Sequence, residues 1–255
     1  MKPANRWWPL ALGVGAYLAF LIVSFPAATA FRWLVPAEVK ASGIEGTLWS
    51  GRAAAASVAD FPLQDLRWRA SPWPLFVGRL SADVEARLPD GFARAHVSAS
   101  ARRVRLGDAR FALSLPTLQA LFPLGGTRGQ ATANLSTVEL TDGWPTAVVG
   151  ELRLAKLEVP PMIRAGAAQL IPLGDYLVRF EPPNGEPKVA ASFNDTGGPL
   201  EVSGTLGLTP NRAYTIDAFV TPRADASPEL VQGLAIMTQD PDSSGRRRLM
   251  LSGTL

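Results

Sequence analysis

The chain has 255 residues, of which 47% are hydrophobic and 18% charged, with no cysteine and one histidine. These numbers exclude a disulfide scaffold and a thiolate metal site, and they argue against a histidine-based metal centre. The formal charge of +3 comes from residues 1–35, which carry three basic and no acidic residues, so residues 36–255 hold 22 of each sign. A neutral body lacks the basic excess that nucleic-acid binding needs.

A long uncharged segment opens the chain. Between Arg6 and Arg32 lie 25 residues without charge, which as a helix would be about 37 Å long and would cross a hydrocarbon core of about 30 Å. Trp7 and Trp8 stand where interfacial aromatic residues are expected, and the basic N-terminal flank favours a cytoplasmic N-terminus. We therefore predict a single-pass membrane helix, with the rest of the chain translocated.

The same segment has a second interpretation. Ala28-Thr29-Ala30 is the small-x-small pattern of a signal-peptide processing site. Both interpretations export the rest of the chain. We expect the segment to be retained, which divides the chain into a cytoplasmic tip and transmembrane anchor at 1–35 and a periplasmic β-rich domain at 36–255.

From residue 44 onward, most segments alternate with the two-residue period of a half-buried strand. Proline and glycine fall between these runs, where turns need a fixed or positive φ. The pattern predicts about ten or eleven strands. The clearest runs are 80–88, 92–100, 108–115, 130–140, 148–159, 188–194, 200–208, 213–221 and 247–255.

Only two stretches have helical character, 116–122 and 227–238. In the second, Ser227 can cap the helix and Pro228 occupies its first position. With so few crossover helices, we predict a mainly β fold, in which an N-terminal transmembrane helix precedes a large curved antiparallel sheet or incomplete barrel with two short helices. A recurring glycine before alternating apolar residues leaves two explanations open, an internal duplication and chance.

Residues that could carry catalysis are sparse. His96 alternates with Arg94 and Ser98 on a polar face, and its own strand supplies no acid to support it as a base. Gly125–Gly129 lacks the Lys-Ser/Thr of a phosphate loop and is interpreted as a turn. Three carboxylate pairs have spacings common in proteins of this size: Asp60 and Asp65, Asp83 and Glu85, Asp240 and Asp242. We predict no catalytic, cofactor or metal site.

Two patches stand out from this background. In the first, glycine on both sides of a tryptophan predicts a large ring lying across close-packed backbone. This patch is either a tryptophan core that pins the first hairpin or an exposed aromatic docking surface. Its members are Gly43, Gly46, Thr47, Leu48, Trp49, Gly51, Trp68 and Trp73.

The second patch, Arg246, Arg247 and Arg248, enters the last predicted strand. It is either a charged edge that discourages aggregation between sheets, which we favour, or a contact for acidic partners or lipid headgroups.

These patches carry a family resemblance. The anchor, the motif Gly-x-x-Gly-Thr-Leu-Trp-Ser-Gly at 43–51, Trp68 and the Trp73-Pro74-Leu75 element resemble the type II secretion system protein N family. Glu45 stands where a small residue is expected, and residues 84–200 carry no matching motif. The end of the chain is similar too: 213–216, Thr221-Pro222-Arg223, Leu230 and Leu234 in a short helix, Gly245-Arg246, and 251–255.

The resemblance implies an accessory, non-enzymatic component of the bacterial inner membrane, in the machine that moves folded proteins from the periplasm across the outer membrane. We therefore expect other type II secretion system proteins as partners, and no cofactor. Apolar residues on one face of nearly every strand support an alternative, a periplasmic lipid-handling protein that holds acyl chains on the concave face of the sheet. A periplasmic hydrolase would require two carboxylates converging in a pocket.

Overall fold

The chain forms one large antiparallel sheet in which each strand pairs with the next along the sequence. The computed structural model describes residues 8–34, 39–58, 61–73, 78–119, 125–160, 170–183, 188–238 and 240–254, and thirteen strands lie in them. The strands are β1 (Val39–Gly46), β2 (Ser50–Val58), β3 (Phe61–Ser71), β4 (Leu80–Leu88), β5 (Gly91–Ala99), β6 (Arg103–Ser114), β7 (Arg128–Thr141), β8 (Trp144–Val159), β9 (Ile171–Glu181), β10 (Val189–Gly197), β11 (Leu200–Leu208), β12 (Ala213–Pro222) and β13 (Arg247–Thr254).

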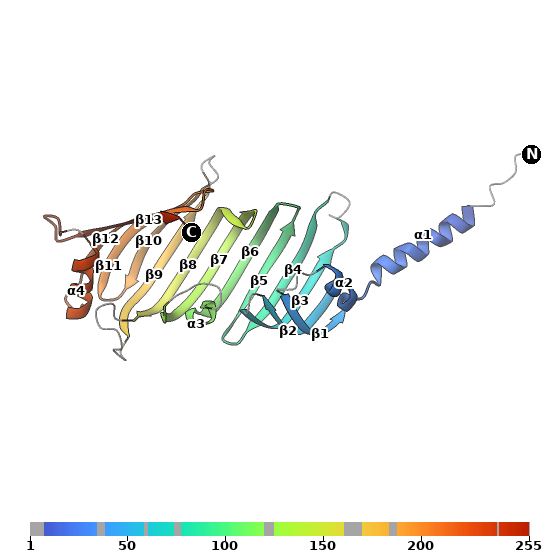
Figure 1. The fold of residues 1–255 in the computed structure, drawn as a ribbon, viewed down its shortest axis with the longest axis horizontal. Coiled ribbons are helices and arrows are strands. Elements are labelled where there is room, and N and C mark those ends of the chain that lie inside the picture. The colour runs from blue at the N-terminus through green and yellow to red at the C-terminus, as the bar shows by residue number, and fades with distance from the viewer. Residues whose placement is uncertain are drawn as a thin grey trace, which may run out of the picture.

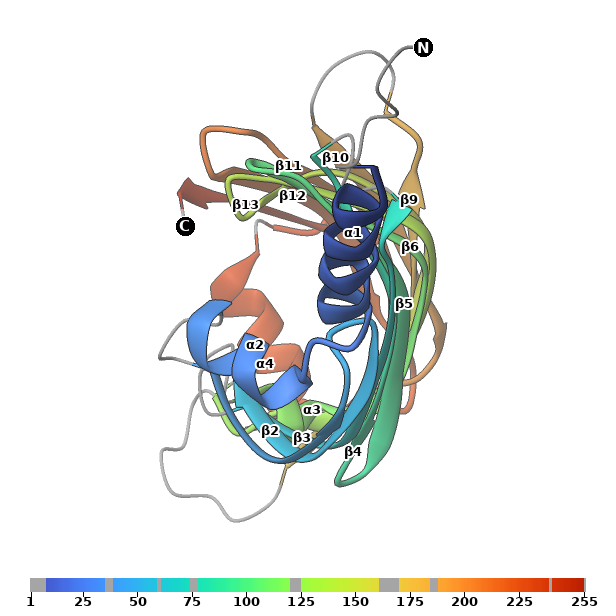
Figure 2. The same ribbon diagram turned by 90° about the vertical axis from the view of Figure 1, so that its right-hand side faces the viewer.

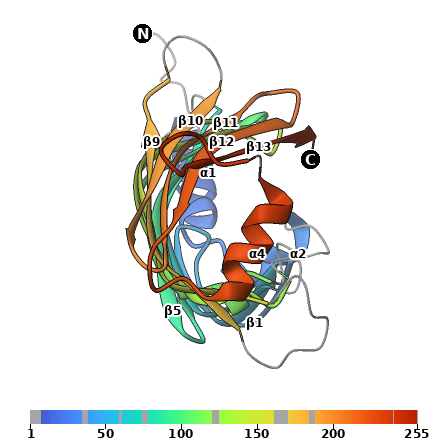
Figure 3. The same cartoon turned by 90° about the vertical axis from the view of Figure 1, so that its left-hand side faces the viewer.

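The sheet is bent into an open trough (Figures 2 and 3). The two-residue period explains its two faces, because opposed residues on neighbouring strands share a face. Phe111, Ala133 and Leu152 lie opposite one another on the inner face, while Arg110 and Glu151 belong to a polar row on the outer face. The prediction of a mainly β, curved and unclosed antiparallel sheet is confirmed, with thirteen strands in place of ten or eleven.

Four helices accompany the sheet in the described residues: α1 (Trp8–Val23), α2 (Ala27–Leu34), α3 (Leu115–Leu118) and α4 (Pro228–Met237). The cap predicted for α4 is present, since the Ser227 side chain accepts a hydrogen bond from the Leu230 amide at 3.3 Å. α3 is shorter than expected, and residues 120–122 of that prediction lie outside the described residues. In Figures 2 and 3, α2 and α4 both lie on the open side of the trough.

The uncharged segment forms two helices separated at Ser24–Pro26. α1 points away from the β1 end of the sheet (Figure 1), and those of its apolar side chains that the structure describes are exposed, with Tyr17 at 62% and Phe20 at 66%. α2 instead packs on the sheet, where Ala27 and Ala30 are each 3% exposed. Among the described residues, no helix combines the length and apolar character needed to cross a membrane.

Apolar side chains form two clusters on the inner face. The middle cluster includes Leu88, Leu113 and Ala131, with Leu115 of α3 packed on them. The C-terminal cluster joins strands β9–β12 to α4 through Leu230 and Leu234. The helices therefore cover the trough at separate places along its length.

Candidate functional site

The first patch forms the turn between β1 and β2. Gly46 has a φ of +92°, and a Cβ there would lie 2.5 Å from the Ser50 carbonyl oxygen, so only glycine fits without strain. A Cβ on Gly51 would lie 2.5 Å from Cζ2 of Trp68. The Trp68 ring therefore occupies the space that a side chain at Gly51 would need.

This turn holds the junction between α1 and α2. The Trp49 indole Nε1 donates to the Ile22 carbonyl in the last turn of α1 at 2.8 Å. The Leu48 amide donates to the Phe25 carbonyl at 2.9 Å, and Thr47 forms a β-bridge with Pro26. Because the last carbonyls of a helix have no partner within it, these contacts both satisfy the end of α1 and fix it to the sheet.

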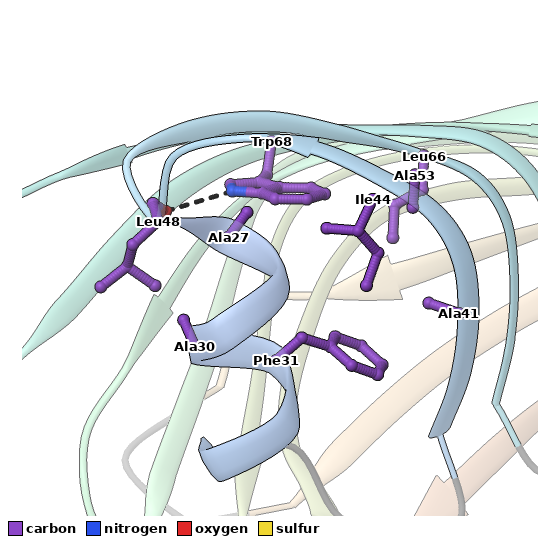
Figure 4. A pocket seen from close by; sticks show the side chains of 9 residues that line it. All are labelled: Ala27, Ala30, Phe31, Ala41, Ile44, Leu48, Ala53, Leu66 and Trp68. Atoms are coloured by element: carbon purple, nitrogen blue, oxygen red, sulfur yellow. Dashed lines mark hydrogen bonds between the residues drawn. The ribbon is translucent and has the colours of Figure 1, made fainter. Parts of the chain in front are cut away.

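A cavity lies between α2 and the first three strands (Figure 4). Its volume is about 220 Å³. The Trp68 ring lies on the sheet side, its Nε1 donating to the Leu48 carbonyl at 3.1 Å. The lining is apolar throughout: Ala27, Ala30, Phe31, Ala41, Ile44, Leu48, Ala53, Leu66 and Trp68.

The remaining members of the first patch lie elsewhere. Trp73 follows β3 and is 77% exposed, away from the cavity lining. Gly43 has a φ of +64° inside β1, where a Cβ would approach that of Ala54 at 2.7 Å. The structure thus brings together six members of the patch and leaves Gly43 and Trp73 outside this group. The six are Gly46, Thr47, Leu48, Trp49, Gly51 and Trp68.

The arginine patch is engaged within the chain. Arg248 donates to both carboxylate oxygens of Asp217 on β12, at 2.9 and 2.6 Å, which holds the pKa of Asp217 below its ordinary value. Arg246 pairs with Asp242 at 3.2 Å and stacks over the Phe219 ring, 5.1 Å from its centroid. Two of the three predicted contact residues therefore neutralise acids of their own chain.

A partly buried polar cluster near α4 was not expected from the sequence. The Asp195 side chain is 7% exposed and pairs with Arg223 at 2.6 Å, and Arg223 also donates to the Gly198 and Leu200 carbonyls. Burial, and next the charge of Asp195, raise the pKa of Tyr176 to about 12. Within this cluster, the sequence analysis had singled out only Arg223, as part of the Thr221-Pro222-Arg223 motif.

His96 is better supported than its own strand suggests. Its Nδ1 lies 2.7 Å from Oδ1 of Asp83, and its Nε2 lies 2.9 Å from Oγ of Ser81, both on neighbouring β4. The lack of an acid therefore holds only for β5. The His96 and Asp83 side chains are 49% and 63% exposed, whereas a serine hydrolase needs a water-excluded site with donors aimed at the oxyanion. We assign no catalytic role to these residues.

The other predicted positions behave as ordinary surface. Gly125 and Gly126 form a turn with positive φ, as expected. Asp83 and Glu85 both lie exposed along β4, and Asp60 lies outside the described residues. Across the part of the chain that the structure describes, no group of three His, Cys, Asp or Glu residues could hold a metal ion.

Comparison with known proteins gives a consistent family assignment. The family model described as "Type II secretion system (T2SS), protein N" matches residues 37–250. The type II secretion system protein N of Aeromonas hydrophila is 29% identical over 257 aligned residues, covering 96% of this chain and 97% of its own. The type II secretion system protein N of Vibrio cholerae is 29% identical over 252 aligned residues, covering 92% of this chain and 93% of its own. No solved structure matches. The chain therefore belongs to the type II secretion system protein N family.

Proposed function

We propose that this protein is a non-enzymatic accessory component of the type II secretion system, anchored in the bacterial inner membrane, that supports export by binding other components. The observation that carries the proposal is α1, an exposed apolar helix whose end is fixed to the sheet by Trp49 and Leu48. An isolated apolar helix with no polar face is stable in lipid and unstable in water.

The proposed anchor is short. The 16 residues of α1 would span about 24 Å as a helix, and Trp7 is the one uncharged residue between Arg6 and α1, so the anchor reaches across most of a hydrocarbon core of about 30 Å. Lys2 and Arg6 favour a cytoplasmic N-terminus, and with α1 as the anchor the sheet would lie in the periplasm. The folded domain would then begin at α2, several residues before position 36.

The far end of the sheet offers a surface for partners. Counting 12 spacings of about 4.8 Å, β13 lies roughly 58 Å along the sheet from β1, at the end opposite α1 (Figure 1). β13 pairs with β12 through eight opposed pairs, and the described residues add no strand beyond it. Met250 is 60% and Leu251 41% exposed on this strand.

An edge of this kind accepts an extended segment of another protein by strand addition, in which backbone hydrogen bonds supply affinity and side chains supply specificity. Arg246 and Arg248 are paired with acids of their own chain, which lowers the net charge at the start of this edge strand, and Met250 and Leu251 are exposed further along it. The proposed partner therefore contributes an extended, predominantly apolar segment.

The test replaces the chromosomal gene in its native host. We expect deletion to reduce export of secreted enzymes, and Met250→Lys with Leu251→Lys to reproduce the loss while the protein stays in the membrane fraction, since lysine on an edge opposes strand addition. Thr205→Lys, on the exposed outer face of β11, is the matched control and should restore export. Unchanged export after deletion would remove the assigned role.

A further inference from the structure

The proposed role in secretion does not make use of the cavity under α2. We propose that it holds part of one acyl chain of a membrane phospholipid. The apolar groups that line it come from α2 and from β1, β2 and β3, so the cavity exists only because α2 lies across the first strands.

The lining decides the chemistry of the occupant. Ordered water is held by polar partners, and the nine lining residues offer none, since the indole Nε1 of Trp68 is used by the Leu48 carbonyl. An apolar cavity of about 150 Å³ takes up benzene, while drug-sized ligands need about 300 Å³ or more. At about 220 Å³, this cavity fits a short length of hydrocarbon chain.

The position of the cavity identifies a phospholipid as the source. α2 begins four residues after α1 ends, and the turn that carries Trp49 holds the two helices together. A chain entering the cavity would therefore come from the bilayer in which α1 is proposed to sit, so the source of the lipid rests on that anchor. Arg32, exposed on α2 next to the lining residue Phe31, supplies a cation for an anionic headgroup.

The test fills the cavity from the sheet side. Ala53 lines it and is 1% exposed, so Ala53→Leu places a larger side chain in the space. Ala54, the next residue on β2, is exposed on the opposite face, which makes Ala54→Leu a matched control. The full-length protein is purified in detergent, co-purified phospholipid is counted by native mass spectrometry, and binding of a dansyl-labelled fatty acid is titrated by fluorescence.

We expect the wild type and Ala54→Leu to retain phospholipid and to bind the probe, and Ala53→Leu to bind it at least about tenfold more weakly. Ala30→Leu, which fills the cavity from α2, should weaken binding similarly and covers the case in which Ala53→Leu fails to fold. Absence of binding to the wild type, or equal binding by all variants, would overturn the proposal. Because export and membrane fractionation are separate measurements, failure here leaves the secretion role standing.

Discussion

Both ends of the trough are covered by a helix, but the helix at one end lies over closely packed side chains and the helix at the other end lies over a cavity. At each end, a helix lies over the inner face of the outermost strands, α2 over β1–β3 and α4 over β9–β12. Under α4 the space is filled by Phe193, Tyr176 and Leu230, whereas under α2 alanines leave a cavity. A helix over this sheet can therefore be closely packed, and the cavity under α2 lies where four of the nine lining residues are alanines.

The largest expected effect tests the filled end. Leu230→Ala removes a side chain that is 9% exposed in the C-terminal cluster, which should lower the free energy of unfolding by about 2–4 kcal/mol through lost contacts and a new cavity. Urea unfolding of the detergent-solubilised protein, followed by tryptophan fluorescence, measures the change. A loss below about 1 kcal/mol would mean that α4 is not closely packed.

Alkaline pH should loosen the same end. The pKa of Tyr176 is raised to about 12, so the folded state favours the neutral phenol. This stability is fully present below the unfolded pKa of about 10 and is lost as the pH rises through about 12. Hydrogen exchange at high pH should show opening at β9–β12 first, and Tyr176→Phe should remove the transition. Opening of β1–β3 before β9–β12 would contradict the expectation that alkaline pH loosens the end covered by α4.

A matched pair of substitutions compares the ends directly. Ala53 and Ala218 are both 1% exposed on inner strand positions. Ala218→Leu should cost about 1–3 kcal/mol by overpacking, because a Cβ on Gly204 would already lie 2.8 Å from that of Ala218. Ala53→Leu should change stability by less than about 0.5 kcal/mol, since the cavity receives it. Thermal unfolding of both variants measures the two losses of stability. Equal losses would mean that the cavity under α2 does not accommodate a leucine side chain.

The smallest effect concerns the fastening of α1. Trp49→Phe keeps the aromatic ring but removes the indole donor to the Ile22 carbonyl, at a cost of about 1 kcal/mol. We expect faster proteolysis between α1 and α2, with no change in global unfolding. Trp73→Phe, at an exposed tryptophan outside the junction, is the control and should leave the proteolysis rate unaltered.

The two-residue period of the sequence predicted most of the strands. Local features of β2, β9 and β6 hid all or part of these three strands. β2 contains four consecutive alanines, Ala53–Ala56, which offer no contrast between faces. β9 contains Pro172 and Gly174, the latter at a φ of +91°, where the register shifts against β8. β6 begins at Arg103 rather than 108 because Asp108, with a φ of +47°, interrupts its alternation. In each case, local geometry hid a strand that pairing with its neighbours stabilises.

The site was less accessible to sequence reasoning. The glycines around Trp49 indicated a ring on close-packed backbone, and the ring over Gly51 is that of Trp68, 17 residues further along the chain. The cavity depends on α2 turning back onto the sheet, although its residues were assigned to the membrane segment. The contacts of His96 with Asp83 and of Arg223 with Asp195 depend on strand register, which the spacing of residues in the sequence does not provide.

The consecutive order of the strands has a consequence for biogenesis. Every described strand borders only its predecessor and successor, so each pairing closes only the chain segment between consecutive strands, and this limits the loop-closure entropy that has to be overcome before the pairing forms. A polypeptide emerging N-terminus first can therefore add one strand at a time to an already ordered edge. At each moment the unfinished sheet then exposes only two edges, that of β1 and that of the most recently added strand, which limits the surface open to misassembly.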